Sequence, residues 1–171
     1  MELLRENYVH NGGEDWNEVE LENKFISPLI VLSKVDNRNF SYFLKRDSAT
    51  VGEYDLSGKV HGMIASGFRS PKKPFFCLHK YKRKSDPNGD PKGQALVAML
   101  AAQSLNNNQN PVLGCYVVGK IWRFIVLDGL NYFQPNLGCR QRRHFGHLLP
   151  PQSPALRNRV WSLFQTLKFQ V

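Results

Sequence analysis

An alanine-rich helix between two groups of strand-like runs is the feature that most constrains the fold. Asp90-Pro91 is a strong helix start, because aspartate caps free N–H groups and proline suits the first helical position. The helix is predicted to continue through residues 94–105 and to end in the asparagines at 106–108. Three strand-like runs precede this helix and two follow it, so a helix interrupts the sequence of the sheet.

The strands are predicted from short apolar runs bounded by turn residues. Another helix is predicted from residue 15 onward, where apolar residues recur at helical spacing until Ser27-Pro28, which should kink or end it. Residues 37–48 are predicted as a loop or a short helix. This order predicts an α/β fold, a single domain with a mixed central β-sheet flanked by helices. The predicted strands are Val51–Ser57, Lys59–Ala65, Pro74–Lys82, Val112–Gly119 and Ile121–Leu127.

A chain of 171 residues is long enough for one domain with its own core. Residues 1–14 are polar and are predicted to be a flexible N-terminal lead-in, and residues 15–135 are predicted to form the core. Residues 136–171 contain several arginines and prolines, and they are predicted as a basic connector followed by a short C-terminal helix.

The compartment is predicted from three negative features. The longest apolar run, Ala95–Ala102, has eight residues, far short of the ~20 that cross a bilayer, so no membrane association is expected. The N-terminus lacks the basic-then-apolar pattern of a secretory signal. The three cysteines include no C-x-x-C pair, so a reducing cytoplasm is the expected compartment.

Charge is distributed unevenly along the chain. Residues 1–55 contain 11 acidic and six basic residues, a net charge of −5, whereas residues 56–171 contain three acidic and 17 basic residues, a net charge of +14. A basic body of this kind favours polyanions, because each phosphate contact releases condensed counterions. Nucleic acid is therefore the expected partner, and a merely soluble basic surface is the alternative.

Four segments carry a family resemblance: LSGKVH (56–61), FFCLHKYK (75–82), GQALVAMLAAQ (93–103) and GCYVVGKIW (114–122). Together with the order of helices and strands, they resemble an uncharacterised bacterial branch of the PD-(D/E)XK, or restriction-endonuclease-like, nucleases. The resemblance covers about residues 20–135 and implies a nuclease-like core. In such nucleases an aspartate on the second strand and the glutamate of a Glu-x-Lys on the third hold Mg²⁺, and the lysine helps to orient the attacking water.

The positions that the resemblance marks as catalytic have changed in charge. His61 stands at the aspartate position and Lys80 at the glutamate position, while Lys82 keeps its type and Gln94 matches a helical residue beside the site. A cation ~4 Å from Lys80 is repelled by roughly 4 kcal/mol per unit charge product at an effective dielectric constant of 20. The sequence therefore predicts that standard Mg²⁺-dependent cleavage is lost and that no metal cofactor is bound.

A phosphate-binding site is predicted in place of the metal. Residues 56–85 contain eight basic residues and no acidic one. The basic cluster lies just before and inside the start of the 91–105 helix, whose free N–H groups favour anions. The alternative is that Lys80 and Lys84 only solvate the end of a strand. The predicted nucleic-acid-binding residues are Lys80, Lys82, Arg83, Lys84 and Lys92.

Acidic residues elsewhere provide an alternative metal site. Glu53 and Asp55 share one face of the strand predicted over 51–57 and would supply displaced ligands for Mg²⁺ or Mn²⁺. A surface role on a half-buried strand is favoured for both. Glu18 and Glu22 lie one helical turn apart and are predicted as a solvated helix face rather than as metal ligands.

Three functions follow from these patterns. The leading hypothesis is a catalytically impaired nuclease-fold protein that binds the nucleic-acid phosphate backbone through a basic former active site, with DNA expected over RNA. The alternatives are an active metal-dependent endonuclease with displaced acidic ligands and a protein–protein adaptor whose charge is incidental. The sequence leaves a homodimer open. A zinc site is disfavoured because the spacing of its candidate ligands matches no familiar finger: Cys139, His144 and His147.

Overall fold

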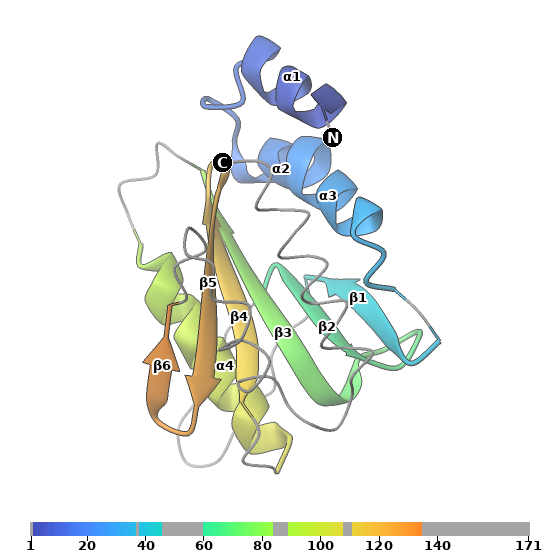
Figure 1. Ribbon diagram of the computed structural model, residues 1–171, viewed down its shortest axis with the longest axis vertical. Coiled ribbons are helices and arrows are strands. Elements are labelled where there is room, and N and C mark those ends of the chain that lie inside the picture. Colours follow the sequence, from blue (N-terminus) through green and yellow to red (C-terminus); the bar gives the residue numbers. More distant parts are fainter. Residues whose placement is uncertain (1, 37, 46–59, 84–88, 108–110, 135–171) are drawn as a thin grey trace, which may run out of the picture.

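Within the residues that the structure describes, a mixed sheet of six strands lies at the centre (Figure 1). The structure, a computed structural model, describes residues 2–36, 38–45, 60–83, 89–107 and 111–134. The strands lie in the order of the sequence; β3 and β4 are parallel, and every other neighbouring pair is antiparallel. The predicted α/β fold with a mixed sheet in a single domain is confirmed. The strands are β1 Phe40–Leu44, β2 Gly62–Ser66, β3 Lys72–Lys82, β4 Val112–Val118, β5 Ile121–Asp128 and β6 Asn131–Phe133.

Helix α4, Pro91–Leu105, connects the two parallel strands, as the sequence predicts. The side chain of Asp90 accepts a hydrogen bond from the backbone N–H of Gly93 at 2.9 Å, which caps the first turn. At the other end, the Asn106 amide pairs with both the backbone N–H and the carbonyl of Phe75, each at 2.9 Å. The helix is therefore fixed at both ends, and its start lies close to the end of β3.

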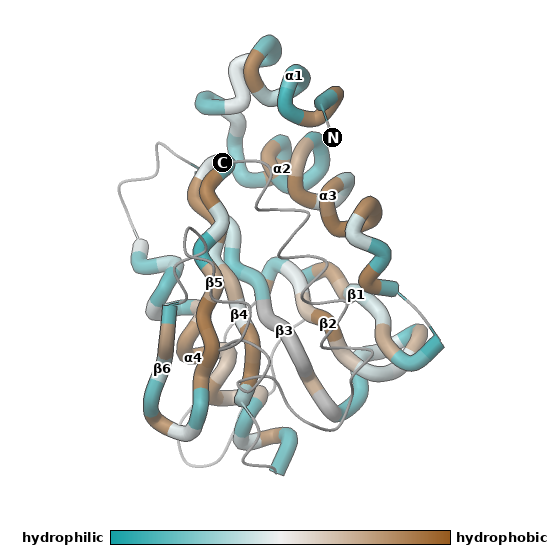
Figure 2. The backbone as a smooth tube through the Cα atoms, in the orientation of Figure 1, coloured by the Kyte–Doolittle hydropathy of each residue, from teal (hydrophilic) through white to brown (hydrophobic). Residues whose placement is uncertain are grey.

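Two apolar clusters cover the two faces of the sheet. On one face α4 packs through small residues such as Ala95, Ala98 and Ala102 against Val112 and Ile125, so that the helix lies close to the strands. Side chains of the N-terminal helices pack against the other face. Figure 2 shows the apolar positions along α3, α4 and β5. No helix within the described ranges is both long and apolar enough to span a bilayer.

The first residues differ from the prediction of a flexible lead-in. Residues Glu2–His10 form helix α1, and Tyr8 from this helix is only 3% exposed. Its ring lies 5.3 Å from that of Trp16 and 5.1 Å from that of Phe25. One buried aromatic residue thus anchors a segment whose remaining composition is polar.

The helix at residues 18–32 is continuous through the predicted break at Ser27-Pro28. It consists of α2 Glu18–Leu21, a π-helical segment η1 Glu22–Ile26 and α3 Ser27–Leu32. The wider π turn, closed by a bond from the N–H of Ser27 to the carbonyl of Glu22, precedes the proline, which has no N–H to donate. Of the two predicted outcomes, a kink or an end, the end is wrong, and the structure instead has a π-helical irregularity directly before Ser27.

The first strand of the sheet lies where a loop or short helix was expected. Strand β1 pairs with β2, with Phe40 opposite Ser66 and Leu44 opposite Gly62. The strand predicted at residues 51–57 lies outside the described residues. The other four predicted strands, which lie between residues 59 and 82 and between 112 and 127, appear as β2, β3, β4 and β5 with small changes in their bounds.

Candidate functional site

Three of the residues predicted for the site meet at one end of β2 and β3. His61 directly precedes β2, and its backbone N–H donates to the carbonyl of His79 at 3.0 Å. The Nδ1 atom of His61 accepts a hydrogen bond from the backbone N–H of Tyr81 at 2.9 Å, which fixes the ring beside β3. Lys80 and Lys82 are two residues apart on β3 and therefore share one of its faces.

Glu18 joins this group from helix α2. Its Oε1 atom lies 3.1 Å from Nζ of Lys82, and its Oε2 atom lies 4.0 Å from Nε2 of His61. The side chain is 37% exposed, so Glu18 keeps contact with water. Glu18 is thus partly solvated, as predicted, but it also contacts residues of the predicted site, which the sequence did not indicate.

Glu22 was also predicted to be solvated, but its side chain is only 8% exposed. Its Oε2 atom lies 3.0 Å from Nζ of Lys45, which follows β1. The backbone N–H of Lys45 donates to the carbonyl of His61 at 3.0 Å, so β1 places this lysine beside the site. Lys45 has a φ of 46°, in the left-handed region that a lysine rarely adopts. Sequence reasoning missed Lys45 because it missed β1.

We call Lys45, His61, Lys80 and Lys82 the lysine site. Burial is the main cause that lowers the pKa of His61, and the charge of Lys80 lowers it further, so the imidazole is neutral near pH 7. Burial also lowers the pKa of Lys80, although the nearby Glu18 carboxylate opposes that change. Three lysines and the two carboxylates Glu18 and Glu22 leave a formal charge of +1. The arrangement favours an anion.

A buried hydrogen-bonded chain supports the site from the opposite face of β3. The hydroxyls of Tyr42 and Tyr81 lie 2.6 Å apart, and the Tyr81 hydroxyl lies 3.0 Å from Nδ1 of His79. Burial lowers the pKa of His79 to about 3 and raises the pKa of Tyr81, so both side chains are neutral at physiological pH. These bonds tie β1 to the segment of β3 that carries the two lysines.

The other predicted residues are distributed around this group. Gln94 lies near Lys82 across Gly89: a carbon built on Gly89 would be 3.8 Å from Nζ of Lys82 and 3.9 Å from Nε2 of Gln94. Arg83 is exposed directly after β3. Lys92 instead donates to the hydroxyl of Tyr132 at 2.8 Å, with its ammonium 4.5 Å from the ring centre. The remaining predicted residues lie outside the described ranges: Lys84, Glu53, Asp55, Cys139, His144 and His147.

A divalent cation does not fit the residues of the lysine site. Mg²⁺ prefers several oxygen ligands, but each of the two carboxylates beside the site already faces an ammonium group: Glu18 lies 3.1 Å from Nζ of Lys82, and Glu22 lies 3.0 Å from Nζ of Lys45. Within the part of the chain that the structure describes, no three His, Cys, Asp or Glu side chains are grouped to hold a metal.

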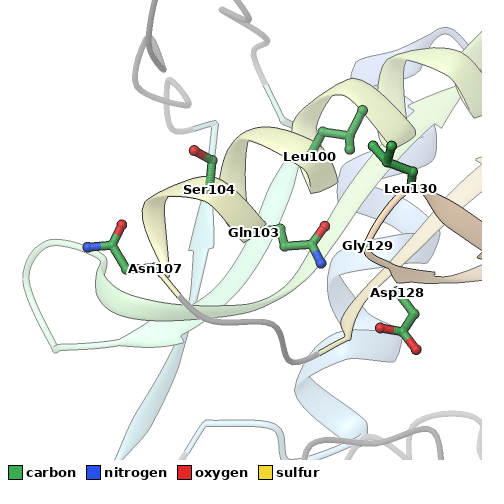
Figure 3. A pocket seen from close by; sticks show the side chains of 7 residues that line it. All are labelled: Leu100, Gln103, Ser104, Asn107, Asp128, Gly129 and Leu130. Carbon is green, nitrogen blue, oxygen red and sulfur yellow. The ribbon is translucent and has the colours of Figure 1, made fainter.

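A separate hollow of about 620 Å³ lies between the end of α4 and the turn from β5 to β6 (Figure 3). With its nitrogen toward the carbonyl, the Gln103 amide pairs with both backbone groups of Gly129 at 3.1 and 3.0 Å. The lining residues include Leu100, Leu130 and a single charged group, Asp128. Because none of the predicted site residues lines this hollow, we place the candidate function at the lysine site.

Similarity to known proteins does not assign this chain to a family. The chain matches no protein-family model, no curated protein and no solved structure. The resemblance to PD-(D/E)XK nucleases stays a prediction that rests on the sequence segments alone. The lysine site is therefore interpreted from its own geometry.

Proposed function

We propose that this protein binds the phosphate backbone of nucleic acid, with DNA as the preferred partner, at the lysine site, and that it does not cut the strand there. The observation that carries the proposal is the meeting of Lys45, Lys80 and Lys82 around a neutral His61. Ammonium groups bind phosphate as point charges, and the Nε2 atom of His61 carries the ring's proton because Nδ1 accepts from Tyr81. The site therefore offers donors to an anion.

The charge of the chain supports a polyanion over a small anion. Residues 56–171, which supply every donor of the site except Lys45, carry a net charge of +14. A polymer with regularly spaced phosphates can contact several of these residues at once, and each contact releases counterions. The absence of cleavage is expected from the local charges, because His61 and Lys80 stand at the positions where the nucleases that this chain resembles have carboxylates to hold their cation.

The proposal predicts that DNA binding depends strongly on salt concentration. A Lys80→Gln/Lys82→Gln variant should have both a lower affinity for DNA and a weaker salt dependence. Fluorescence anisotropy with a short labelled duplex at several salt concentrations gives both the affinity and its salt slope. We expect the variant to lose about tenfold or more in affinity and the slope to fall by about 2, since each phosphate contact contributes about 0.9.

The matched control is Lys72→Gln/Lys73→Gln, which removes the same charge from two exposed residues at the other end of β3. Equal losses for the two variants would contradict a localised site and leave only a general effect of charge.

A cleavage gel tests the second half of the proposal. Plasmid incubated with the wild-type protein and Mg²⁺ should stay intact. Cleavage that EDTA stops would contradict the second half of the proposal and direct attention to Glu53 and Asp55.

A further inference from the structure

The Glu18 carboxylate touches the lysine site at the place where an anion would bind. One oxygen contacts Lys82 at 3.1 Å, and the other faces Nε2 of His61 at 4.0 Å. The same carboxylate raises the pKa of Lys80, so its charge acts on that ammonium as well. Two oxygens of one anionic group thus face the same donors that we assign to a phosphate.

The packing of the helix, and not only its attraction to Lys82, brings Glu18 to this position. Trp16 is 4% exposed and Leu21 is 1% exposed, so buried residues hold the chain on both sides of Glu18. Asn17 caps the helix by accepting from the N–H of Glu20 at 3.0 Å, and the Glu20 side chain accepts in return from the N–H of Asn17. The backbone is therefore fixed, whereas the Glu18 side chain keeps the freedom of a 37% exposed group.

Exchange of this carboxylate for a phosphate favours polymers over small anions. When a small anion binds, it replaces one charge-assisted ion pair at Lys82 by another, so the gain in binding free energy is small. A nucleic-acid backbone adds contacts to neighbouring basic residues and releases counterions, which compensates for the lost ion pair.

We propose that Glu18 is a built-in competitor for phosphate, so that nucleic acid binds the lysine site by displacing the Glu18 carboxylate from Lys82. This inference rests on the proposed function and adds to it a means by which the site rejects small anions. Because the Glu18 side chain is already 37% exposed, it can turn toward solvent when displaced, while the 3.0 Å pair of Glu22 with Lys45 is unaffected.

The test is the affinity of a Glu18→Gln variant for a short labelled DNA duplex, measured by fluorescence anisotropy at one salt concentration. Loss of the competing charge is expected to tighten binding about five- to tenfold. The matched control is Glu20→Gln, which removes the same charge two residues away, where the carboxylate pairs with Lys24 at 2.8 Å. This control should change the affinity less than about twofold.

A double-variant cycle separates local competition from the general effect of charge. In a Lys82→Gln background, Glu18→Gln should tighten binding less than about twofold, because its partner is gone. Equal gains for Glu18→Gln and Glu20→Gln, or an undiminished gain in the Lys82→Gln background, would overturn the inference. If Glu18→Gln changes nothing while Lys80→Gln/Lys82→Gln still weakens binding, only the inference fails. If neither variant changes the affinity, the proposed function fails with it.

Discussion

A protein carrying His61→Asp together with Lys80→Glu is expected to bind Mg²⁺ or Mn²⁺, with a dissociation constant on the order of 1 mM or below. The two substitutions change the formal charge of the site by −3 and place two carboxylates beside Glu18, whose oxygens lie 3.1 Å from Lys82 and 4.0 Å from His61. They also remove the ammonium that repels a cation by several kcal/mol, roughly 4 kcal/mol per unit charge product at ~4 Å. The fold should tolerate the change, because an aspartate oxygen can accept the Tyr81 N–H that His61 now accepts at 2.9 Å.

Isothermal titration calorimetry with each cation measures this effect directly, and a plasmid-cleavage gel shows whether binding leads to hydrolysis. The matched control is His61→Asn/Lys80→Gln, which has nearly the same shape but no added carboxylate and should bind neither cation. A folded His61→Asp/Lys80→Glu protein without cation binding would refute the assignment of these positions to a former metal site. Cleavage by that variant, with a silent wild type, would support both the nuclease resemblance and the loss of activity.

Gly62→Ala is expected to lower the free energy of unfolding by about 2–4 kcal/mol. A methyl group on Gly62 would overlap the Tyr42 hydroxyl and come within 2.7 Å of the ring carbon Cε2. Tyr42 cannot move away without breaking its half-buried 2.6 Å hydrogen bond to the hydroxyl of Tyr81, a residue that is only 1% exposed. The cost therefore combines overpacking with the loss of this hydrogen bond, and chemical denaturation followed by tryptophan fluorescence measures it.

The control for this prediction is the same substitution in a Tyr42→Ala background. With the ring removed, Gly62→Ala should cost less than about 1 kcal/mol beyond the cost of Tyr42→Ala itself. An equal cost in both backgrounds would show that the methyl group is excluded by something other than Tyr42. Wild-type stability of Gly62→Ala would show that Tyr42 does not lie over this glycine.

Helix α4 and the strands around it could be predicted from the sequence, because the helix start and the apolar strand-like runs are signals carried by residues close together in the chain. The helix start at Asp90-Pro91 depends only on nearby residues: the Asp90 side chain caps the helix by accepting from the N–H of Gly93, three residues later. β1 could not be predicted in the same way. Its buried residues Phe40 and Phe43 are three apart, a spacing typical of a helix, because the strand does not alternate regularly between buried and exposed positions.

The sequence predicted three residues of the site, the two lysines of β3 from their spacing and His61 from the family resemblance. Lys80 and Lys82 share a face of one strand, and a two-residue spacing is enough to infer this. Tertiary packing brings Glu18, Glu22 and Lys45 to the site. From the sequence alone, the two glutamates look like an exposed helix face and Lys45 looks like part of a loop, so nothing indicates that they meet. The burial of Glu22 depends on a lysine 23 positions later, whose location follows from a strand that the pattern did not indicate.

The most direct test of the central claim is an NMR titration of the isotope-labelled protein with a short DNA duplex. If DNA binds at the lysine site, amide shift changes will concentrate at Glu18, Lys45 and His61 and at the end of β3 from His79 to Lys82. We expect these changes to shrink in the Lys80→Gln/Lys82→Gln variant. Changes centred on another face, or none at DNA concentrations that saturate the anisotropy signal, would contradict a phosphate-binding site at these lysines.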